Sequence, residues 1–149
     1  MTSKITIGIN GFGRIGKSIL LQSITNNALK IRAINAPDVN IQNDTAHGKN
    51  GVNIIIDSND TIKIDGQKIK ILNQRNPDKN MWYENGVNYI TETTGMFLTK
   101  EKALEHGDSF DGFVMCAPSK DNTPQFVVGG NHMNYKGENI VSNASCTTN

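Results

Sequence analysis

The residues with the clearest potential for chemistry lie late in the chain, where a thiol is surrounded by hydroxyls. In the segment SNASCTTN, Cys146 follows Ser145 and precedes Thr147, and a short apolar run comes shortly before it. An apolar run followed by small polar residues is typical of a strand that leads into a helix. The positive end of a helix dipole favours the thiolate form of a cysteine. Cys146 is therefore either a nucleophile or a buried, inert cysteine, and this segment alone leaves both open.

A second chemical feature is the glycine-rich stretch GFGRIG at residues 11–16. It follows the β-branched run 4–10 and precedes apolar residues at helical spacing, so it joins a predicted strand to a predicted helix. In this context Gly11 makes a tight turn, Gly13 lets the backbone approach a pyrophosphate, and Gly16 allows the helix to pack closely. The helix N-terminus would then face the phosphates. The alternative is a glycine-rich turn that only packs tightly, but the context favours dinucleotide binding.

One part of the dinucleotide pattern is missing. The pattern expects an acidic residue at the end of the second strand, about 20 residues further on, to bind the adenosine ribose. Here the predicted strand 31–35 is followed by Ala36 and Pro37, and the first carboxylate is Asp38.

Composition excludes several classes of function. The 149 residues include 15 Lys and Arg and 14 Asp and Glu, so the net charge of +1 gives no reason to expect nucleic acid or a membrane surface as a partner. No apolar stretch approaches the ~20 residues of a membrane span, and the N-terminus does not resemble a signal peptide. Cys116 and Cys146 lack metal-ligand spacing, so no metal site is predicted. A reducing, cytoplasmic setting fits best.

The order of the elements predicts an α/β fold. Strands alternate with helices in the first third, and later strands end in glycine or proline turns. We expect a single dinucleotide-binding domain over residues 1–149, with a Rossmann-type, doubly wound, mainly parallel sheet and a small antiparallel appendage. The predicted sheet strands are 4–10, 31–35, 87–93, 112–117 and 138–142, with a further short strand at 125–128. The predicted antiparallel meander is 52–56, 61–64 and 68–72, and helices are expected from residue 14 and over 100–106.

Further motifs join the two chemical features into one pattern. INGFGRIG at 9–16 and SNASCTTN at 142–149 are the most specific, and between them lie AIN (33–35), DTAHGK (44–49), QRNP (74–77), ETTGMF (92–97), CAPS (116–119) and GGNHMNY (129–135). Over essentially its whole length the chain resembles the N-terminal, NAD-binding half of the glyceraldehyde-3-phosphate dehydrogenase family. Erythrose-4-phosphate dehydrogenase shares nearly all of these motifs and stays open as an alternative.

The resemblance implies a set of NAD-binding residues: Gly11, Phe12, Gly13, Arg14, Ile15, Gly16, Asn35, Arg75, Thr94, Gly95 and Cys116. The 11–16 turn would lie along the pyrophosphate, Asn35 near the adenosine and Arg75 beside the adenine. Thr94 and Gly95 would line the path toward the nicotinamide ribose. Cys116 stands where the family has a serine, and we interpret it as a small buried thiol that replaces a small buried hydroxyl.

The resemblance also implies a reaction. Cys146 would be the nucleophile, flanked by Ser145 and by Thr147, which helps to bind a substrate phosphate in the family. Its thiolate would attack the aldehyde carbon of glyceraldehyde 3-phosphate, and the resulting hemithioacetal would pass a hydride to the nicotinamide ring. Inorganic phosphate would then open the thioester so formed to give 1,3-bisphosphoglycerate, a step of glycolysis. The family's enzymes are homotetramers.

Two departures qualify the expectation. Ala36 replaces the family's ribose-binding acid, so tolerance of NADP is predicted, although no arginine is evident to bind its 2′-phosphate because Arg32 lies within a strand. The family's substrate domain and its histidine base would come after residue 149, and we interpret His47, His106 and His132 as structural or solvent-exposed. The chain alone is therefore expected to be inactive. The competing hypothesis is a stand-alone nucleotide-binding module without catalysis.

Overall fold

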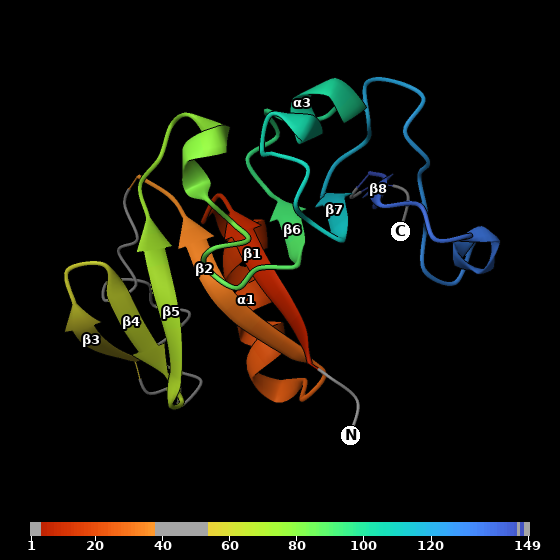
Figure 1. Cartoon of the computed structure of the whole chain (residues 1–149). Coiled ribbons are helices and arrows are strands. Elements are labelled where there is room, and N and C mark those ends of the chain that lie inside the picture. Colours follow the sequence, from red (N-terminus) through yellow and green to blue (C-terminus); the bar gives the residue numbers. More distant parts are fainter. Residues whose placement is uncertain (1–3, 38–53, 146, 148–149) are drawn as a thin grey trace.

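One twisted sheet organises the part of the chain that is described, which in this computed structural model comprises residues 4–37, 54–145 and 147 (Figure 1). Its strands lie side by side in the order β3-β4-β5-β2-β1-β6-β7-β8. In chain order they are β1 (Ile5–Asn10), β2 (Leu29–Asn35), β3 (Ile54–Ser58), β4 (Thr61–Ile64), β5 (Gln67–Leu72), β6 (Tyr89–Glu92), β7 (Gly112–Met115) and β8 (Ile140–Ser142).

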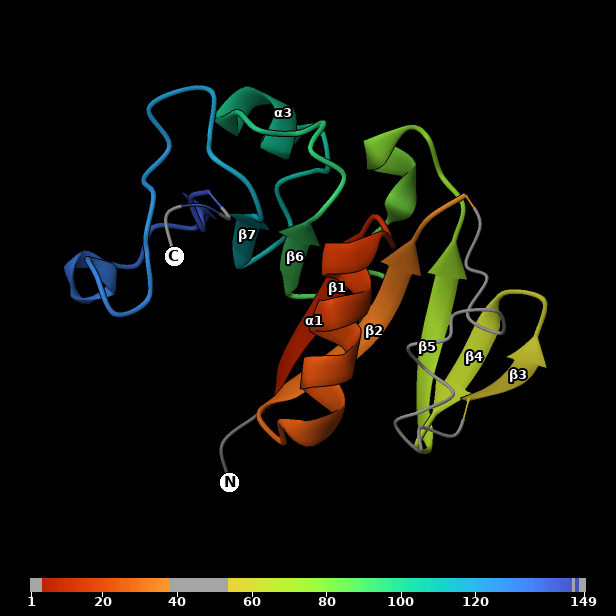
Figure 2. The same ribbon diagram turned by 180° about the vertical axis from the view of Figure 1, so that it is seen from behind.

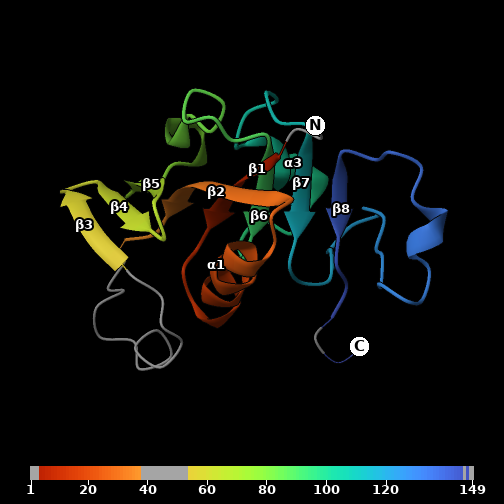
Figure 3. The ribbon, with the colours of Figure 1, turned by 90° about the horizontal axis from the view of Figure 1, so that it is seen from below.

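Short helical segments cover the two faces of this sheet. Helix α1 (Arg14–Thr25) crosses one face over β1 and β2, as Figure 2 shows, while α3 (Lys100–Leu104) lies on the opposite face (Figure 3). Two 3-10 turns, η1 (Pro77–Asn80) and η2 (His132–Asn134), follow β5 and precede β8 respectively. No helix in the described ranges is long and apolar enough to cross a membrane.

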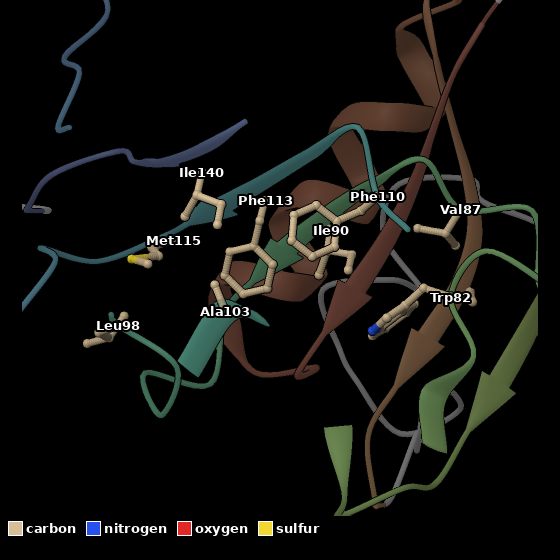
Figure 4. Packing of buried hydrophobic residues seen from close by; sticks show 10 residues of the cluster. Trp82, Val87, Ile90, Leu98, Ala103, Phe110, Phe113, Met115 and Ile140 are labelled. Carbon is tan, nitrogen blue, oxygen red and sulfur yellow. The ribbon is translucent and has the colours of Figure 1, made fainter. Parts of the chain in front are cut away.

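Each face of the sheet has its own apolar core because side chains alternate between the faces along each strand. On the α1 face, Ile9 and Ile34 pack with Leu20 of the helix. On the other face, Trp82 and Phe113 belong to a second cluster, shown in Figure 4, whose other labelled members are Val87, Ile90, Leu98, Ala103, Phe110, Met115 and Ile140. Strands β2 and β6 contribute to both cores: Ala33 and Ile90 belong to the second cluster, whereas Ile34 and Tyr89 pack on the α1 face.

The predicted fold class is confirmed. β1 pairs in parallel with β2 and β6, and the parallel series continues through β7 and β8. The meander β3-β4-β5 is antiparallel, as expected, with Asp65 and Gly66 in the left-handed conformation of a hairpin turn. It is not separate from the main sheet, because β5 pairs in parallel with β2. The strand predicted at 125–128 is wrong: only Gln125 forms a bridge, with Ser142.

Candidate nucleotide-binding site

The turn after β1 brings the start of α1 to the carboxyl edge of the sheet. Gly11 has φ +96°, which other residues rarely adopt, and its N–H donates to the Asn35 carbonyl at 2.8 Å. A Cβ on Gly16 would lie 2.5 Å from the Gly11 carbonyl oxygen. The absence of a side chain at Gly16 therefore allows helix and turn to pack closely, as the glycine spacing predicted.

The N-terminus of α1 is suited to an anion. Its N-cap residue, Gly13, makes no side-chain capping hydrogen bond, and the first turn contains no acidic residue. The positive end of the helix dipole is therefore not neutralised by a carboxylate of this turn. The backbone N–H groups of the turn stay available to bind an anion. A Cβ on Gly13 would meet nothing within 4 Å, so there is open space over this turn. Arg14 and Ile15 are exposed beside it, and Phe12 lies under Lys17.

A cavity of about 340 Å³ lies at the carboxyl ends of β1, β2 and β6. It falls where the strand order reverses, since β2 lies on one side of β1 and β6 on the other. Ligands of open α/β sheets bind at this topological switch point, and the volume is in the range of small-molecule sites. Of the residues predicted to bind NAD, four line the cavity: Gly11, Asn35, Arg75 and Thr94.

The end of β2 offers the cavity little polar recognition. Asn35 lines it, but its side chain donates to Asn10 Oδ1 and to the Gln74 carbonyl and accepts from the Gln74 N–H. The next residue, Ala36, also lines the cavity. Among the described lining residues there is no carboxylate, and Arg75 carries the permanent positive charge. Asp38 lies outside the described residues.

Two buried polar residues in the cavity wall were not predicted. Asn80, at the end of η1, is 1% exposed, and neither polar atom of its side chain has a hydrogen-bond partner. His106 is also buried; its Nδ1 accepts from Trp82 Nε1 at 3.1 Å, and burial lowers its pKa to about 4. The interpretation of His106 as structural or solvent-exposed left its burial open, and asparagine is usually exposed, so no local pattern indicated that these two residues would line the cavity. His132 is exposed in η2, and His47 lies outside the described residues.

The remaining predicted cofactor residues lie near the cavity but not in its wall. Gly95 follows Thr94 with φ +75°. Cys116 follows β7, and its N–H donates to the Glu92 carbonyl at 2.9 Å. Burial, and then the nearby Glu92 carboxylate, raise the pKa of the Cys116 thiol to about 11.

Cys116 is expected to be an unreactive thiol. Two pKa units above the ordinary value of 9.0 lower its thiolate fraction at pH 8 by about 100-fold. In a Cys146→Ser variant, the remaining thiol should react with iodoacetamide about 100-fold more slowly in the folded chain than in urea. Equal rates in the two states would show that Cys116 is accessible and ionises normally.

The segment that follows β8 carries the predicted substrate residues. The Ser145 and Thr147 hydroxyls are hydrogen-bonded to each other at 2.8 Å, and the Thr147 N–H donates to Ser145 Oγ. Neither residue lines the 340 Å³ cavity. Cys146, the predicted nucleophile between them, lies outside the described residues.

Comparison with known proteins agrees with this geometry. The family model described as glyceraldehyde 3-phosphate dehydrogenase, NAD binding domain, matches residues 5–100, from the start of β1 to the start of α3. The chain belongs to this family. The glyceraldehyde-3-phosphate dehydrogenase match thus covers the glycine turn, the cavity-lining strand ends and the η1 segment.

Individual members of the family are similar along nearly the whole chain. Glyceraldehyde-3-phosphate dehydrogenase A of Escherichia coli K12 is 41% identical over 97% of the chain, and the enzyme of Phytophthora infestans is 42% identical over 97%. Glyceraldehyde-3-phosphate dehydrogenase 1 of Trichoderma koningii is 40% identical over 96%. The chain spans less than half of the length of these relatives, 44–46% of each.

Proposed function

We propose that this chain is the NAD-binding part of a phosphorylating glyceraldehyde-3-phosphate dehydrogenase. The observation that carries the proposal is the joint occurrence of an uncapped α1 N-terminus and a cavity at the neighbouring strand ends, within a family defined by NAD binding. The turn 11–16 would hold the pyrophosphate through backbone N–H groups. Asn35 would lie near the adenosine and Arg75 beside the adenine. Thr94 and Gly95 would line the path toward the nicotinamide ribose.

The proposed reaction uses a hydride acceptor and a thiol. NAD, when bound, accepts the hydride that the aldehyde loses. Cys146 would form the covalent bond to the aldehyde carbon, and Ser145 and Thr147 would flank it, with Thr147 near a substrate phosphate. Inorganic phosphate would then release the acyl group from the cysteine. A thiolate suits both steps because it is a strong nucleophile and an adequate leaving group.

We also propose a cytosolic setting and assembly into a homotetramer for the longer enzyme of this type. One of the similar relatives, from Trypanosoma brucei brucei, is named as cytosolic, which supports the proposed setting.

Titration of the chain with NAD tests the proposed function. Trp82 is the only tryptophan, and it contacts His106 in the cavity wall, so its fluorescence should change as the cavity fills. Saturable binding supports the proposal, whereas no response to NAD in fluorescence and no heat in calorimetry would contradict it.

The chain is expected to discriminate weakly between NAD and NADP. Ala36 lines the cavity where an acid would repel a 2′-phosphate, and Arg75 lines the same cavity as a positively charged partner. We expect the two dissociation constants to agree within about tenfold, or ~1.4 kcal/mol. Parallel titrations with both dinucleotides measure the ratio.

The matched variant for this test is Ala36→Asp, which should weaken NADP binding by at least about tenfold while retaining NAD, with Ala36→Ser as a control for size. If the unmodified chain binds NAD a hundredfold more tightly than NADP, another group has taken over the role of the missing acid.

A further inference from the structure

Three buried polar side chains form a row beneath the proposed nucleotide cavity. Asn35, Asn10 and Glu92 are the last residues of β2, β1 and β6, and the sheet register places them directly beside one another. Their exposed fractions are 8%, 3% and 1%. Asn10 and Asn35 also line the cavity, as does Thr94, which follows Glu92 closely in the chain.

The hydrogen bonds in this row have a fixed direction. The Gln74 N–H donates to Asn35 Oδ1 at 2.9 Å, and the Gln74 carbonyl accepts from Asn35 Nδ2 at 3.0 Å, so the backbone sets the orientation of the Asn35 amide. Asn35 Nδ2 also donates to Asn10 Oδ1 at 2.8 Å. This leaves Asn10 Nδ2 to donate to Glu92 Oε2, at 2.7 Å.

The row ends at Glu92, which accepts on both oxygens. Oε2 receives the Asn10 amide, and Oε1 receives the Thr94 N–H at 2.6 Å and the Thr94 hydroxyl. An ionised carboxylate is the side-chain group that accepts on both oxygens without donating. A glutamine here would point its NH₂ either at Asn10 Nδ2 or at the Thr94 N–H, and either arrangement places donor against donor.

The charge of Glu92 is held without a cationic partner among the described residues. His106 Nε2 lies 3.9 Å from Oε2, but burial keeps this imidazole neutral near pH 7. Cys116 contributes a neutral thiol from the end of β7. Burial raises the pKa of Glu92, and the hydrogen bonds from Thr94 and Asn10 oppose that effect. Burial of this carboxylate is unfavourable, and the hydrogen bonds that it accepts at the strand ends offset that cost.

We infer that Glu92 is a positioning residue for the nucleotide, because it terminates a directed hydrogen-bond row that holds the ends of β1, β2 and β6 in the shape of the cavity. The inference rests on the proposed nucleotide-binding function. Glu92 acts through Asn10 and Thr94, which line the cavity, and does not contact the ligand itself.

Two single variants and their combination test the direction of the row. In Glu92→Gln an amide NH₂ opposes Asn10 Nδ2, and in Asn10→Asp two carboxylates face each other. Each should weaken NAD binding by about tenfold or more at pH 7.5, the loss expected for a hydrogen bond to a charged group. Asn10→Asp should partly recover at pH 5.5, because one of the facing carboxylates then holds a proton.

The double variant Asn10→Asp/Glu92→Gln restores a complete row. The carboxylate introduced at position 10 would accept from Asn35 and from the amide introduced at position 92. The carbonyl oxygen of that new amide would still accept from Thr94. NAD affinity should return to within about threefold of the unmodified chain. Additive losses in the double variant, or unchanged binding in Glu92→Gln, would overturn the inference, since a packing role alone predicts no rescue.

A ligand-free measurement separates this inference from the proposed function. The urea midpoints of the four proteins should show the same rescue without nucleotide. If the unmodified chain binds no NAD, both the proposed function and the nucleotide-positioning role fail. If it binds NAD and Glu92→Gln binds equally well, only the inference fails. If Glu92→Gln does not fold, recovery of folding and binding in the double variant still supports the row.

Discussion

Replacing Gly16 by alanine is expected to destabilise the chain by about 1–3 kcal/mol, the usual cost of an added methyl group in a packed interior, and to abolish nucleotide binding. The new Cβ would lie 2.5 Å from the Gly11 carbonyl oxygen and 3.2 Å from both Ile9 Cγ2 and Thr93 Oγ1. The first of these neighbours is backbone and cannot rotate away. Helix α1 must therefore shift from the turn, which displaces the N–H groups that would bind the pyrophosphate.

Gly13→Ala is the matched control. Nothing lies within 4 Å of its added Cβ, and its φ of −82° is accessible to alanine. Its stability should stay within about 1 kcal/mol of the unmodified chain, the scale of an N-cap change. Its NAD affinity should nevertheless fall at least about tenfold, because the methyl group occupies the space proposed for the pyrophosphate.

Urea unfolding and NAD titration of the two variants distinguish the two glycines. The expected pattern is loss of both properties in Gly16→Ala and loss of binding alone in Gly13→Ala. A Gly16→Ala variant as stable as the unmodified chain would show that the helix can move without cost. Full NAD affinity in Gly13→Ala would place the pyrophosphate elsewhere.

The second large effect concerns catalysis: the 149-residue chain on its own should produce NADH from glyceraldehyde 3-phosphate, NAD and phosphate no faster than its Cys146→Ser variant. A positioned general base typically contributes ~10²–10⁴-fold. Correct orientation of the reactants contributes up to ~7–11 kcal/mol. Of the two described histidines, each uses its Nδ1 lone pair as a hydrogen-bond acceptor, so the neutral ring carries its proton on Nε2 and is not expected to act as the base. His106 accepts from Trp82 and has a pKa of about 4, and His132 Nδ1 accepts from the Gly129 N–H.

Absorbance of NADH over time gives the result directly. The serine variant controls for thiol-dependent turnover, and a parallel NAD titration shows that the chain is folded and loaded. Steady NADH production that is lost in the serine variant would mean that the chain supplies a base of its own.

Local patterns were enough to predict most of the fold. Alternation and glycine turns located β1, α1, β2 and the meander within a few residues, because these signals lie within each element. The failures involve long-range contacts. The parallel pairing of β5 with β2 leaves no local mark in either strand. The segment 125–128 has the composition of a strand but forms a single bridge, since composition does not provide a partner.

The same distinction holds for the candidate site. The turn 11–16 was predictable because its chemistry is contained in consecutive residues. The row of Asn35, Asn10 and Glu92 was not, because an asparagine at a strand end is also typical of an exposed turn. Only the register of three strands shows that these side chains meet. Asn80 and His106 were missed for a related reason, since their burial depends on the segments that close over them.

The strand order also sets the order in which the chain can fold. β4 and β5 pair across a two-residue turn, whereas Asn10 and Glu92, neighbours in the sheet, are 82 residues apart. Distant parallel pairs form slowly, because loop closure must precede any gain from the contact. At synthesis rates of about 5–20 residues per second, β1 has one unpaired edge for roughly 4–16 s before β6 leaves the ribosome. The meander can therefore form early during synthesis. The cavity at the end of β1 can form only after β6 has been synthesised.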